Sequence, residues 1–439
     1  MKTSEHNALC DAWDPTRSLS ELDFVTRCTL GHLVKASKPA ITNPPIHLTA
    51  RGAARVKGGH VWVYRSDIKE PKQKLEPGAL VAVLDEKGRI LGDALYSTAS
   101  LIAIRMFASS REETLASDLA EIVGNRVAAA IAYRDEIVQQ SEACRLVFSE
   151  ADFLPGLIVD RYEDIITMQV LTQAMDRPDL RDAVLQSLRE HFPSATVYER
   201  VDERIRELEH LPPKASGVVA KPQKGNAKTA TIFNINNLRF HYDVASGQKT
   251  GAFLDQRDNY AAAAQYARGD ALDVFTYQGG FALHLYQNCR RVTGVDSSRQ
   301  ALEVAEDNAG LNGYNVDWVE ANAFDYLKDQ STSGRMYDTI VLDPPAFAKT
   351  RKNFDTAIRG YKELNLRALK MLRAGGTLIT CSCSFHVSEA EFLEMLTAAT
   401  ADAHRRVRVL EKRNAAKDHP VLLGVPETNY LKCIIARVE

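Results

Sequence analysis

The sequence predicts an α/β protein in which a small β-barrel-like module and a small α+β unit precede a C-terminal domain with a parallel sheet. Two observations in the 439 residues support this prediction. Short apolar strands, separated by turn residues, fill the region from Ile46 to Phe107. From Ala271 onward, apolar strands alternate with helical stretches, which is typical of a parallel sheet covered by helices on both faces.

The composition indicates a globular chain of about two to four domains. Hydrophobic residues make up 45% and charged residues 26% of the sequence. The formal net charge is −2, without the basic excess that many nucleic-acid-binding proteins carry. Because net charge is an average over the whole surface, a basic groove on one face remains compatible with it.

Seven cysteines are scattered along the chain, and their spacing fits neither a zinc site nor a small disulfide scaffold. We therefore expect reduced thiols, no metal and a cytoplasmic location. The sequence contains no run of 18 apolar residues and no signal-peptide pattern at its start, so we expect no membrane partner.

Residues 1–45 form a polar N-terminal extension, and residues 46–125 form the β-barrel-like module. A helix should follow the strands, because apolar residues recur every three or four positions from Leu115 to Val123. The expected elements are strands at Val61–Tyr64, Ala79–Leu84, Arg89–Gly92 and Leu101–Phe107, and a helix at 111–140.

Residues 126–210 form the expected central α+β unit. Its elements are strands at Gly156–Val159 and Asp164–Thr172 with a turn at Asp160–Tyr162, a helix at Pro178–His191 and a strand at Thr196–Glu199. Residues 211–230 contain prolines, glycines and four lysines without an acidic residue, which indicates a linker or mobile loop.

Residues 231–439 form the expected C-terminal α/β domain, and the first three of its strands end in polar residues. The expected strands are Ala271–Phe275, Arg291–Val295, Asp317–Glu320, Thr339–Leu342 and Gly376–Cys381. Open α/β sheets bind ligands at the carboxyl ends of their strands. We therefore expect the functional site at this edge.

The turn after the first of these strands is a candidate cofactor site. Gly279 and Gly280 open a helix there and would let a ligand approach the backbone closely, although an ordinary strand–helix turn is an alternative interpretation. Asp296 ends the second strand, where a carboxylate can accept hydrogen bonds from two ribose hydroxyls. The three-glycine fingerprint of pyrophosphate cofactors is missing, which favours S-adenosylmethionine. Asn322, after the third strand, could accept a bond from the adenine amino group.

The ends of the fourth and fifth strands are candidates for the chemistry. Asp343 precedes two prolines that hold the backbone rigid, which suits an acid that orients a base, although a capping aspartate in a proline-rich turn is the alternative. Cys381 and Cys383 would face the same side of a continuing strand. A thiolate can add to carbon 6 of a pyrimidine and activate carbon 5 for methylation, which requires a lowered thiol pKa. The alternative is that both cysteines are small buried residues.

These residues belong to a wider set of motifs that resembles bacterial 23S rRNA methyltransferases which make 5-methylcytosine and carry an N-terminal PUA domain. The resemblance covers roughly residues 46–439. The motifs that carry it are 58–63, 152–161, 246–251, 253–257, Asp343-Pro344-Pro345 with Phe347, 381–384, 418–420 and 426–432.

The resemblance implies a class I methyltransferase domain with a seven-stranded mixed sheet, and a PUA-like module that contacts RNA. The implied cofactor contacts are Gln248, Lys249, Thr250, Asp255, Arg257, Asp273, Phe275, Tyr277, Gly279, Gly280, Asp296, Ser297, Asn322, Ala323 and Asp343. The implied nucleophile is Cys383, with Cys381 as second choice and Asp343 as a further catalytic residue. Two departures are Ala346, where related enzymes often have a product-releasing cysteine, and Asn322, where an aspartate is usual.

The implied partner is 23S rRNA or a precursor of the large ribosomal subunit, and a homodimer stays open. Two rival functions remain at this point. An amino-group methyltransferase acting on guanine N2 or adenine N6 would use Asp-Pro-Pro and an aromatic residue without any cysteine. A ribosome-assembly protein that has lost its methylation chemistry would bind RNA but not S-adenosylmethionine.

Overall fold

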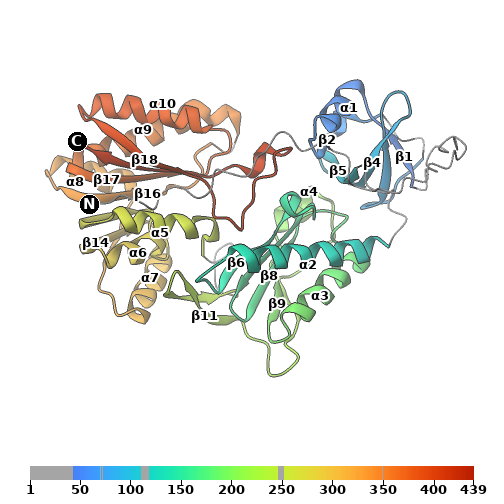
Figure 1. Cartoon of the computed structure of the whole chain (residues 1–439), viewed down its shortest axis with the longest axis horizontal. Coiled ribbons are helices and arrows are strands. Elements are labelled where there is room, and N and C mark those ends of the chain that lie inside the picture. The colour runs from blue at the N-terminus through green and yellow to red at the C-terminus, as the bar shows by residue number, and fades with distance from the viewer. Residues whose placement is uncertain (1–42, 70, 72, 110–117, 246–251, 349) are drawn as a thin grey trace, which may run out of the picture. The chain divides into compact units, whose positions relative to one another are not determined.

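The computed structural model describes residues 43–439 apart from 70, 72, 110–117, 246–251 and 349. The described residues form two five-stranded sheets, one two-stranded hairpin and one seven-stranded sheet (Figure 1). No helix among them has the combination of length and apolar character that crossing a membrane requires.

The first sheet has the strand order β1-β3-β4-β5-β2. It is antiparallel except for the β1–β3 pair. Its core contains Ile46, Val63, Val83 and Ile104, all fully buried. The elements are β1 (Pro45–His47), α1 (Ala50–Lys57), β2 (Trp62–Tyr64), η1 (Arg65–Asp67), β3 (Leu80–Leu84), β4 (Ile90–Tyr96) and β5 (Ile102–Ser109).

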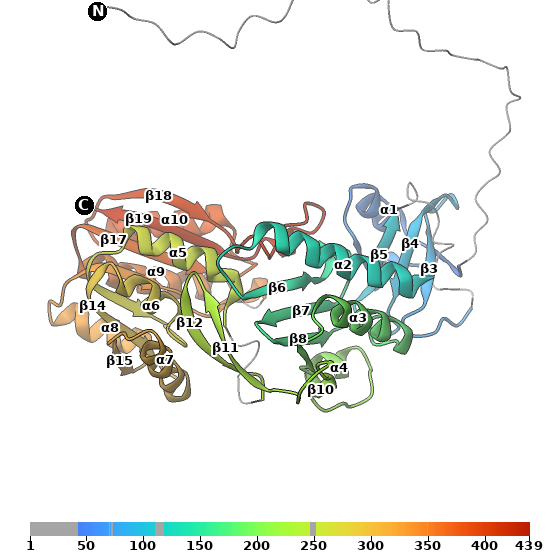
Figure 2. The same ribbon diagram turned by 60° about the horizontal axis from the view of Figure 1, so that its bottom comes forward.

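The second sheet, of order β10-β9-β8-β7-β6, is covered by the packed helices α2 and α3 (Figure 2). In α3, Leu180, Val184 and Leu188 recur at helical spacing and are buried. The elements are α2 (Leu119–Ile137), β6 (Ala143–Phe148), η2 (Ser149–Asp152), β7 (Leu157–Tyr162), β8 (Ile165–Val170), α3 (Pro178–His191), β9 (Thr196–Glu199), α4 (Glu203–Leu208) and β10 (Gly217–Ala220).

Three expectations for this region need correction. The proposed boundary at residue 125 falls inside α2, whose packing against α3 and β6 places it with the second sheet. Residues 160–162 continue β7, and the chain turns at Glu163, which adopts a φ of 51°. The segment 211–230 contains β10, which pairs with β9, so it is not only a linker.

The third sheet is the seven-stranded mixed sheet of order β15-β14-β13-β16-β17-β19-β18, in which only the pairs involving β19 are antiparallel. A hairpin of β11 (Ala230–Ile235) and β12 (Leu238–Asp243) precedes it. The strands are β13 (Gly269–Val274), β14 (Cys289–Asp296), β15 (Asp317–Glu320), β16 (Tyr337–Leu342), β17 (Leu372–Ser382), β18 (Val407–Arg413) and β19 (Lys432–Val438).

Helices cover both faces of this sheet, α5 to α7 on one face and α8 to α10 on the other (Figure 1). They are α5 (Arg257–Tyr266), α6 (Gly280–Tyr286), α7 (Arg299–Leu311), α8 (Ala323–Thr332), α9 (Phe354–Met371) and α10 (Glu389–Asp402), with η3 (Leu254–Gln256), η4 (Arg351–Asn353) and η5 (Pro426–Thr428). The predicted fold class is thereby confirmed. The carboxyl ends of β13, β14, β16 and β17 meet at one edge, where the strand order reverses.

Candidate active site

A cleft of about 500 Å³ opens at this carboxyl edge. Its lining residues come from η3, from the strand ends and from the segment before β19. They are Phe253, Asp255, Gln256, Phe275, Tyr277, Asp296, Ser297, Asp343, Pro344, Pro345, Cys383, Tyr430 and Leu431. Seven of the predicted site residues thus lie together, namely Asp255, Phe275, Tyr277, Asp296, Ser297, Asp343 and Cys383.

The turn between β13 and α6 has an unusual backbone. Phe275 and Tyr277 adopt φ angles of 67° and 52°, which side-chain-bearing residues rarely adopt. Asp273 holds the turn, because its Oδ2 accepts hydrogen bonds from the Thr276 hydroxyl at 2.6 Å and the Ala282 amide at 2.9 Å. Strain of this kind concentrates at functional sites, and here it accompanies two aromatic residues that line the cleft.

The two glycines of this turn allow close packing within the fold, and their predicted contact with a ligand stays a prediction. A Cβ on Gly280 would lie 2.6 Å from the Tyr260 ring, so this position allows α5 and α6 to pack closely. Gly279 adopts a φ of 86°, and its Cβ would lie 3.0 Å from Trp318. Neither glycine lines the cleft, and neither does Asp273.

Asp296 ends β14, and its carboxylate links the turn after β13 to the residues that precede α7. Its Oδ2 accepts from the Tyr277 amide and its Oδ1 from the Ser298 amide, both at 2.9 Å. Each carboxylate oxygen has a second lone pair, so the side chain can still accept bonds from a ligand in the cleft.

Asn322 and Ala323 lie away from this cleft. The Asn322 amide oxygen, expected to read an adenine, instead caps α8 by accepting from the Phe324 amide at 3.0 Å and the Asp325 amide at 3.4 Å. Ala323 is buried in the core below β14 and β16. In the described structure both residues thus lie outside the cleft lining, and their contact with a ligand stays a prediction.

Cys383 and Asp343 are neighbours across the ends of β16 and β17. The Cys383 Sγ lies 3.9 Å from the carbonyl oxygen of Pro344, the residue that follows Asp343. Asp343 Oδ1 accepts a hydrogen bond of 3.0 Å from the Gln256 side chain. The thiol and the carboxyl group thus face the same cleft.

Burial shifts the protonation of these groups. It raises the pKa of Asp343 to about 8, with a further contribution from the carboxylates of Asp255 and Asp273. It likewise raises the pKa of the Cys383 thiol to about 12, with contributions from Asp343 and Asp255. The expectation of a lowered cysteine pKa is therefore wrong for the protein without ligand.

One buried cation lies next to Cys383. Lys432 Nζ donates to the carbonyl oxygens of Ser384 at 2.7 Å and Tyr430 at 2.8 Å. Burial lowers the pKa of Lys432 to about 8, while Cys383 acts in the opposite direction. The positive charge of Lys432 lowers the pKa of the Cys383 thiol and so stabilises its thiolate form.

Cys381 is a core residue. It is fully buried and is paired across the sheet with Cys433. Because β17 ends at Ser382, the strand alternation that would have placed both cysteines on the same side does not continue to Cys383. The second-choice nucleophile is therefore excluded from the cleft.

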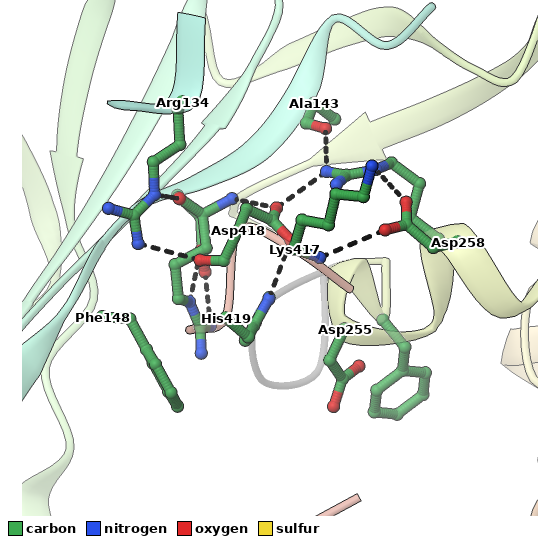
Figure 3. A network of polar contacts seen from close by, with 12 residues as sticks. Arg134, Ala143, Phe148, Asp255, Asp258, Lys417, Asp418 and His419 are labelled. Carbon is green, nitrogen blue, oxygen red and sulfur yellow. Dashed lines mark hydrogen bonds and ion pairs between the residues drawn. The ribbon is translucent and has the colours of Figure 1, made fainter. Parts of the chain in front are cut away.

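Arg257 was expected to contact the cofactor, but its guanidinium forms an ion pair with Asp418, which is part of the polar network drawn in Figure 3. Its Nη1 donates to Asp418 Oδ2 at 2.7 Å, and both side chains are buried. Asp418 also accepts from the Arg145 amide at 2.8 Å, and its own carbonyl accepts from Arg134 at 2.8 Å. Arg257 therefore connects the sheet of β6 to the third sheet.

Six lining residues were not among the predicted site residues: Phe253, Gln256, Pro344, Pro345, Tyr430 and Leu431. All six lie within the motifs that carry the family resemblance, so membership of a motif is the sequence feature that could have identified them. Tyr430 donates to Asp255 Oδ2 at 2.7 Å and so links β19 to η3. The predicted residues Gln248, Lys249 and Thr250 lie outside the described residues.

The charged residues that line the cleft are all acidic. Three aspartates line it, and none of its described lining residues is Lys, Arg or His. Asp273 adds a buried Oδ1 without a hydrogen-bond partner in the described structure, and burial raises its pKa to about 7. Carboxyl groups kept close together in this way suit a ligand that carries positive charge.

Comparisons with known proteins agree with this arrangement. A PUA-like domain model matches residues 46–109, and a model of S-adenosylmethionine-dependent methyltransferases matches residues 183–427. Ribosomal RNA large subunit methyltransferase I of Shewanella frigidimarina is 35% identical over 387 residues, covering 86% of this chain and 95% of that protein. The protein of the same name from Pseudoalteromonas translucida is 33% identical over 401 residues, covering 90% and 99%.

A solved structure shows the same fold. A S-adenosylmethionine-dependent methyltransferase from Streptococcus mutans has a TM-score of 0.74 and 18% identity, and the match covers 90% of this chain and 99% of that one. The likeness extends over the three sheets of the described chain.

Proposed function

This chain belongs to the S-adenosylmethionine-dependent methyltransferases, in the family of Ribosomal RNA large subunit methyltransferase I, and we propose that it methylates carbon 5 of a cytosine in 23S rRNA. The proposal rests on one observation above all. The Cys383 thiol lies 3.9 Å from the Pro344 carbonyl, in the same cleft as Asp343. A nucleophile and an acid that line the same cleft suit a reaction through a covalent pyrimidine adduct.

The cleft fits the cofactor. S-adenosylmethionine supplies an electrophilic methyl group on a sulfonium, and it also carries an ammonium group. Asp255 and Asp296 line the cleft, and none of its described lining residues is basic, which suits such a cation. We assign Asp296 to the ribose hydroxyls and the turn of Phe275 and Tyr277 to the nucleoside, with Asp255 and residues 248–250 contributing from the preceding segment.

Cys383 and Asp343 would then act together on the cytosine. The Cys383 thiol loses its proton to solvent, the resulting thiolate forms a bond to carbon 6, and the Asp343 carboxyl group gives its proton to ring nitrogen 3. A carboxyl group with a pKa of about 8 is protonated at neutral pH and can serve as this donor. Electron density thereby moves to carbon 5, which becomes able to accept a methyl group.

Product release reverses the first step. A solvent base removes the proton from carbon 5, the carbon–sulfur bond breaks, and its electron pair returns to Cys383. The nitrogen 3 proton goes back to the Asp343 carboxylate and the Cys383 thiolate takes up a proton from solvent, so both side chains regain their starting forms. Lys432 stabilises the thiolate in both steps, and a bound sulfonium would add to its effect.

The test uses the full chain and 23S rRNA from a strain that lacks this protein. Cys383→Ala should lower methyl transfer roughly thousandfold or more while leaving S-adenosylmethionine binding intact. Cys289→Ala removes another half-buried thiol outside the cleft and should retain activity. Mass spectrometry of the rRNA identifies the base, and RNA containing 5-azacytidine should become bound to Cys383.

The amino-group alternative predicts full activity of Cys383→Ala and methylation of a purine nitrogen. Its key aromatic residue, Phe347, packs on Tyr361 with ring centroids 4.8 Å apart and does not line the cleft. This packing favours the cytosine reaction. A protein without chemistry would fail to bind S-adenosylmethionine in equilibrium dialysis.

The PUA-like module is the part of the chain that we expect to bind RNA. The PUA-like module would contact RNA by its shape and backbone, as RNA-binding modules commonly do. Large ribosomal subunits and their precursors are cytoplasmic in bacteria, and we place the reaction there.

A further inference from the structure

A chain of buried amide groups leads from the surface of the C-terminal domain to Asp343. Arg413, at the end of β18, donates from Nε to Asn259 Oδ1 at 2.9 Å. Asn259 Nδ2 donates to Gln256 Oε1 at 2.7 Å, and Gln256 Nε2 donates to Asp343 Oδ1 at 3.0 Å. We call Arg413, Asn259 and Gln256 the amide relay.

The direction of every bond in the amide relay is determined by chemistry. A guanidinium can only donate, so the atom of Asn259 that faces Arg413 must be the oxygen. The Asn259 nitrogen also donates to the carbonyl oxygen of Asn414 at 3.1 Å, and a carbonyl can only accept. Two independent partners therefore orient Asn259, and its orientation then determines that of Gln256.

Burial makes this orientation hard to reverse. Gln256 is 2% exposed and Asn259 is fully buried. Turning either amide would place like atoms opposite each other, donor to donor or acceptor to acceptor, without water to replace the lost bonds. Asp343 Oδ1 therefore always receives an N–H group.

We propose that the amide relay places the acidic proton of Asp343 on Oδ2, the oxygen that Gln256 leaves available to a substrate. Arg413, Asn259 and Gln256 are on this view positioning residues that act through Asp343. The inference rests on the proposed use of Asp343 as an acid but holds for any acceptor base that this carboxyl group serves.

The charged and titratable groups around Asp343 set the conditions of the test. They are Asp255 from η3, Asp273 from β13, Tyr260 from α5, Cys381 from β17 and Cys383 after it, and Tyr430 and Lys432 near the start of β19. A comparison of variants at equal pH keeps these groups constant, because the substitutions below leave all of them unchanged.

Gln256→Glu is the sharpest variant because it has the same shape. Asn259 would still bind one carboxylate oxygen, so the other would face Asp343 Oδ1 at about 3 Å. Two carboxyl groups at this distance share one proton, and Oδ2 would lose it at neutral pH. The kcat of methyl transfer should fall at least about tenfold at pH 8, and the ratio of variant to wild-type kcat should rise as the pH is lowered to 6.

Asn259→Asp tests the relay from a residue outside the cleft. Its carboxylate would draw the Gln256 nitrogen toward itself, so the Gln256 oxygen would face Asp343 and accept a hydrogen bond from Oδ1, which moves the acidic proton away from Oδ2 until a lower pH neutralises the new carboxylate. The same pH-dependent kcat ratio is expected. Gln265→Glu, an exposed change on the same helix, should keep a ratio near one at every pH.

Melting temperature and S-adenosylmethionine affinity are measured for each variant. A kcat ratio that does not change with pH would overturn the relay, because a purely structural defect has no such dependence. Loss of folding in both relay variants would also overturn it. The Cys383→Ala result decides the covalent mechanism separately, so the two proposals can fail independently.

Discussion

At the scale of single residues, the cleft keeps carboxyl groups in an environment that disfavours their charge. Burial raises the pKa of Asp343 above its unfolded value, to about 8. A raised folded pKa means that the associated stability is present below the unfolded value, near pH 4, and is lost as the pH rises through 8. Asp343 therefore weakens the fold at the pH at which the reaction would run, as functional residues often do.

Asp343→Asn should show this effect. The variant should be more stable than the wild type by about 1–2 kcal/mol at pH 8, with a smaller gain at pH 5, while losing methyl transfer. Urea unfolding at several pH values measures the difference. A gain that is the same at pH 5 and pH 8 would contradict the assigned ionisation, and Asp325→Asn on exposed α8 serves as the control.

A second prediction concerns Lys432, the buried ammonium beside Cys383. Lys432→Met should raise the pKa of the Cys383 thiol and slow methyl transfer by roughly tenfold to a hundredfold. The rate at which iodoacetamide modifies Cys383, followed by mass spectrometry over a range of pH, reports the thiol pKa directly. An unchanged pH dependence of alkylation would remove Lys432 from the mechanism.

At the scale of elements, the sequence predicted the bounds of those helices and strands whose residue pattern is local. Both α3 and β15 have the predicted bounds, because the buried face of α3 repeats at helical spacing and polar residues surround β15. Two predicted site residues have structural partners that the motifs did not indicate. Arg257 forms an ion pair with Asp418, which lies 161 residues further along the chain. Asn322 caps the helix that it precedes, although its position after β15 suggested a ligand contact.

Gly280 is likewise explained by a packing partner that the sequence motif did not indicate, and it allows a prediction about how α5 and α6 pack. Gly280→Ala should push α6 away from Tyr260 on α5, costing about 1–3 kcal/mol and weakening S-adenosylmethionine binding through the adjoining turn. Gly310→Ala lies in α7, where a Cβ meets nothing within 4 Å, and should instead stabilise by about 0.5–1 kcal/mol. Opposite signs in thermal unfolding would support the close approach of the helices, and equal effects would refute it.

At the scale of the whole molecule, the central sheet and the C-terminal domain share one core. Ala143, Tyr162 and Ile165 belong to the same buried cluster as Phe281 and Ile435. The domain division expected from the sequence separates residues 126–210 from residues 231–439, and this core contains residues of both that are far apart in the chain. The Asp418 network crosses the same junction (Figure 3).

Asp418→Asn should therefore weaken the molecule as a whole. Burial alone would raise the pKa of Asp418, but His419 and Arg257 hold it well below its usual value. Stability from a lowered pKa is present above the unfolded value, near pH 4, and is lost as the pH falls further. The variant should lose about 3 kcal/mol at pH 7, because Arg257 stays buried without its partner, and the loss should shrink below pH 4.

Calorimetry of the same variant tests the junction between the two sheets. If the shared core and this ion pair make them unfold together, the wild type should show one transition for both, and the variant should show two. Asp317→Asn breaks an Arg–Asp pair that is about half exposed, and it should cost less than about 1 kcal/mol and leave the number of transitions unchanged. A single transition in Asp418→Asn at every pH would mean that apolar packing alone couples the sheets.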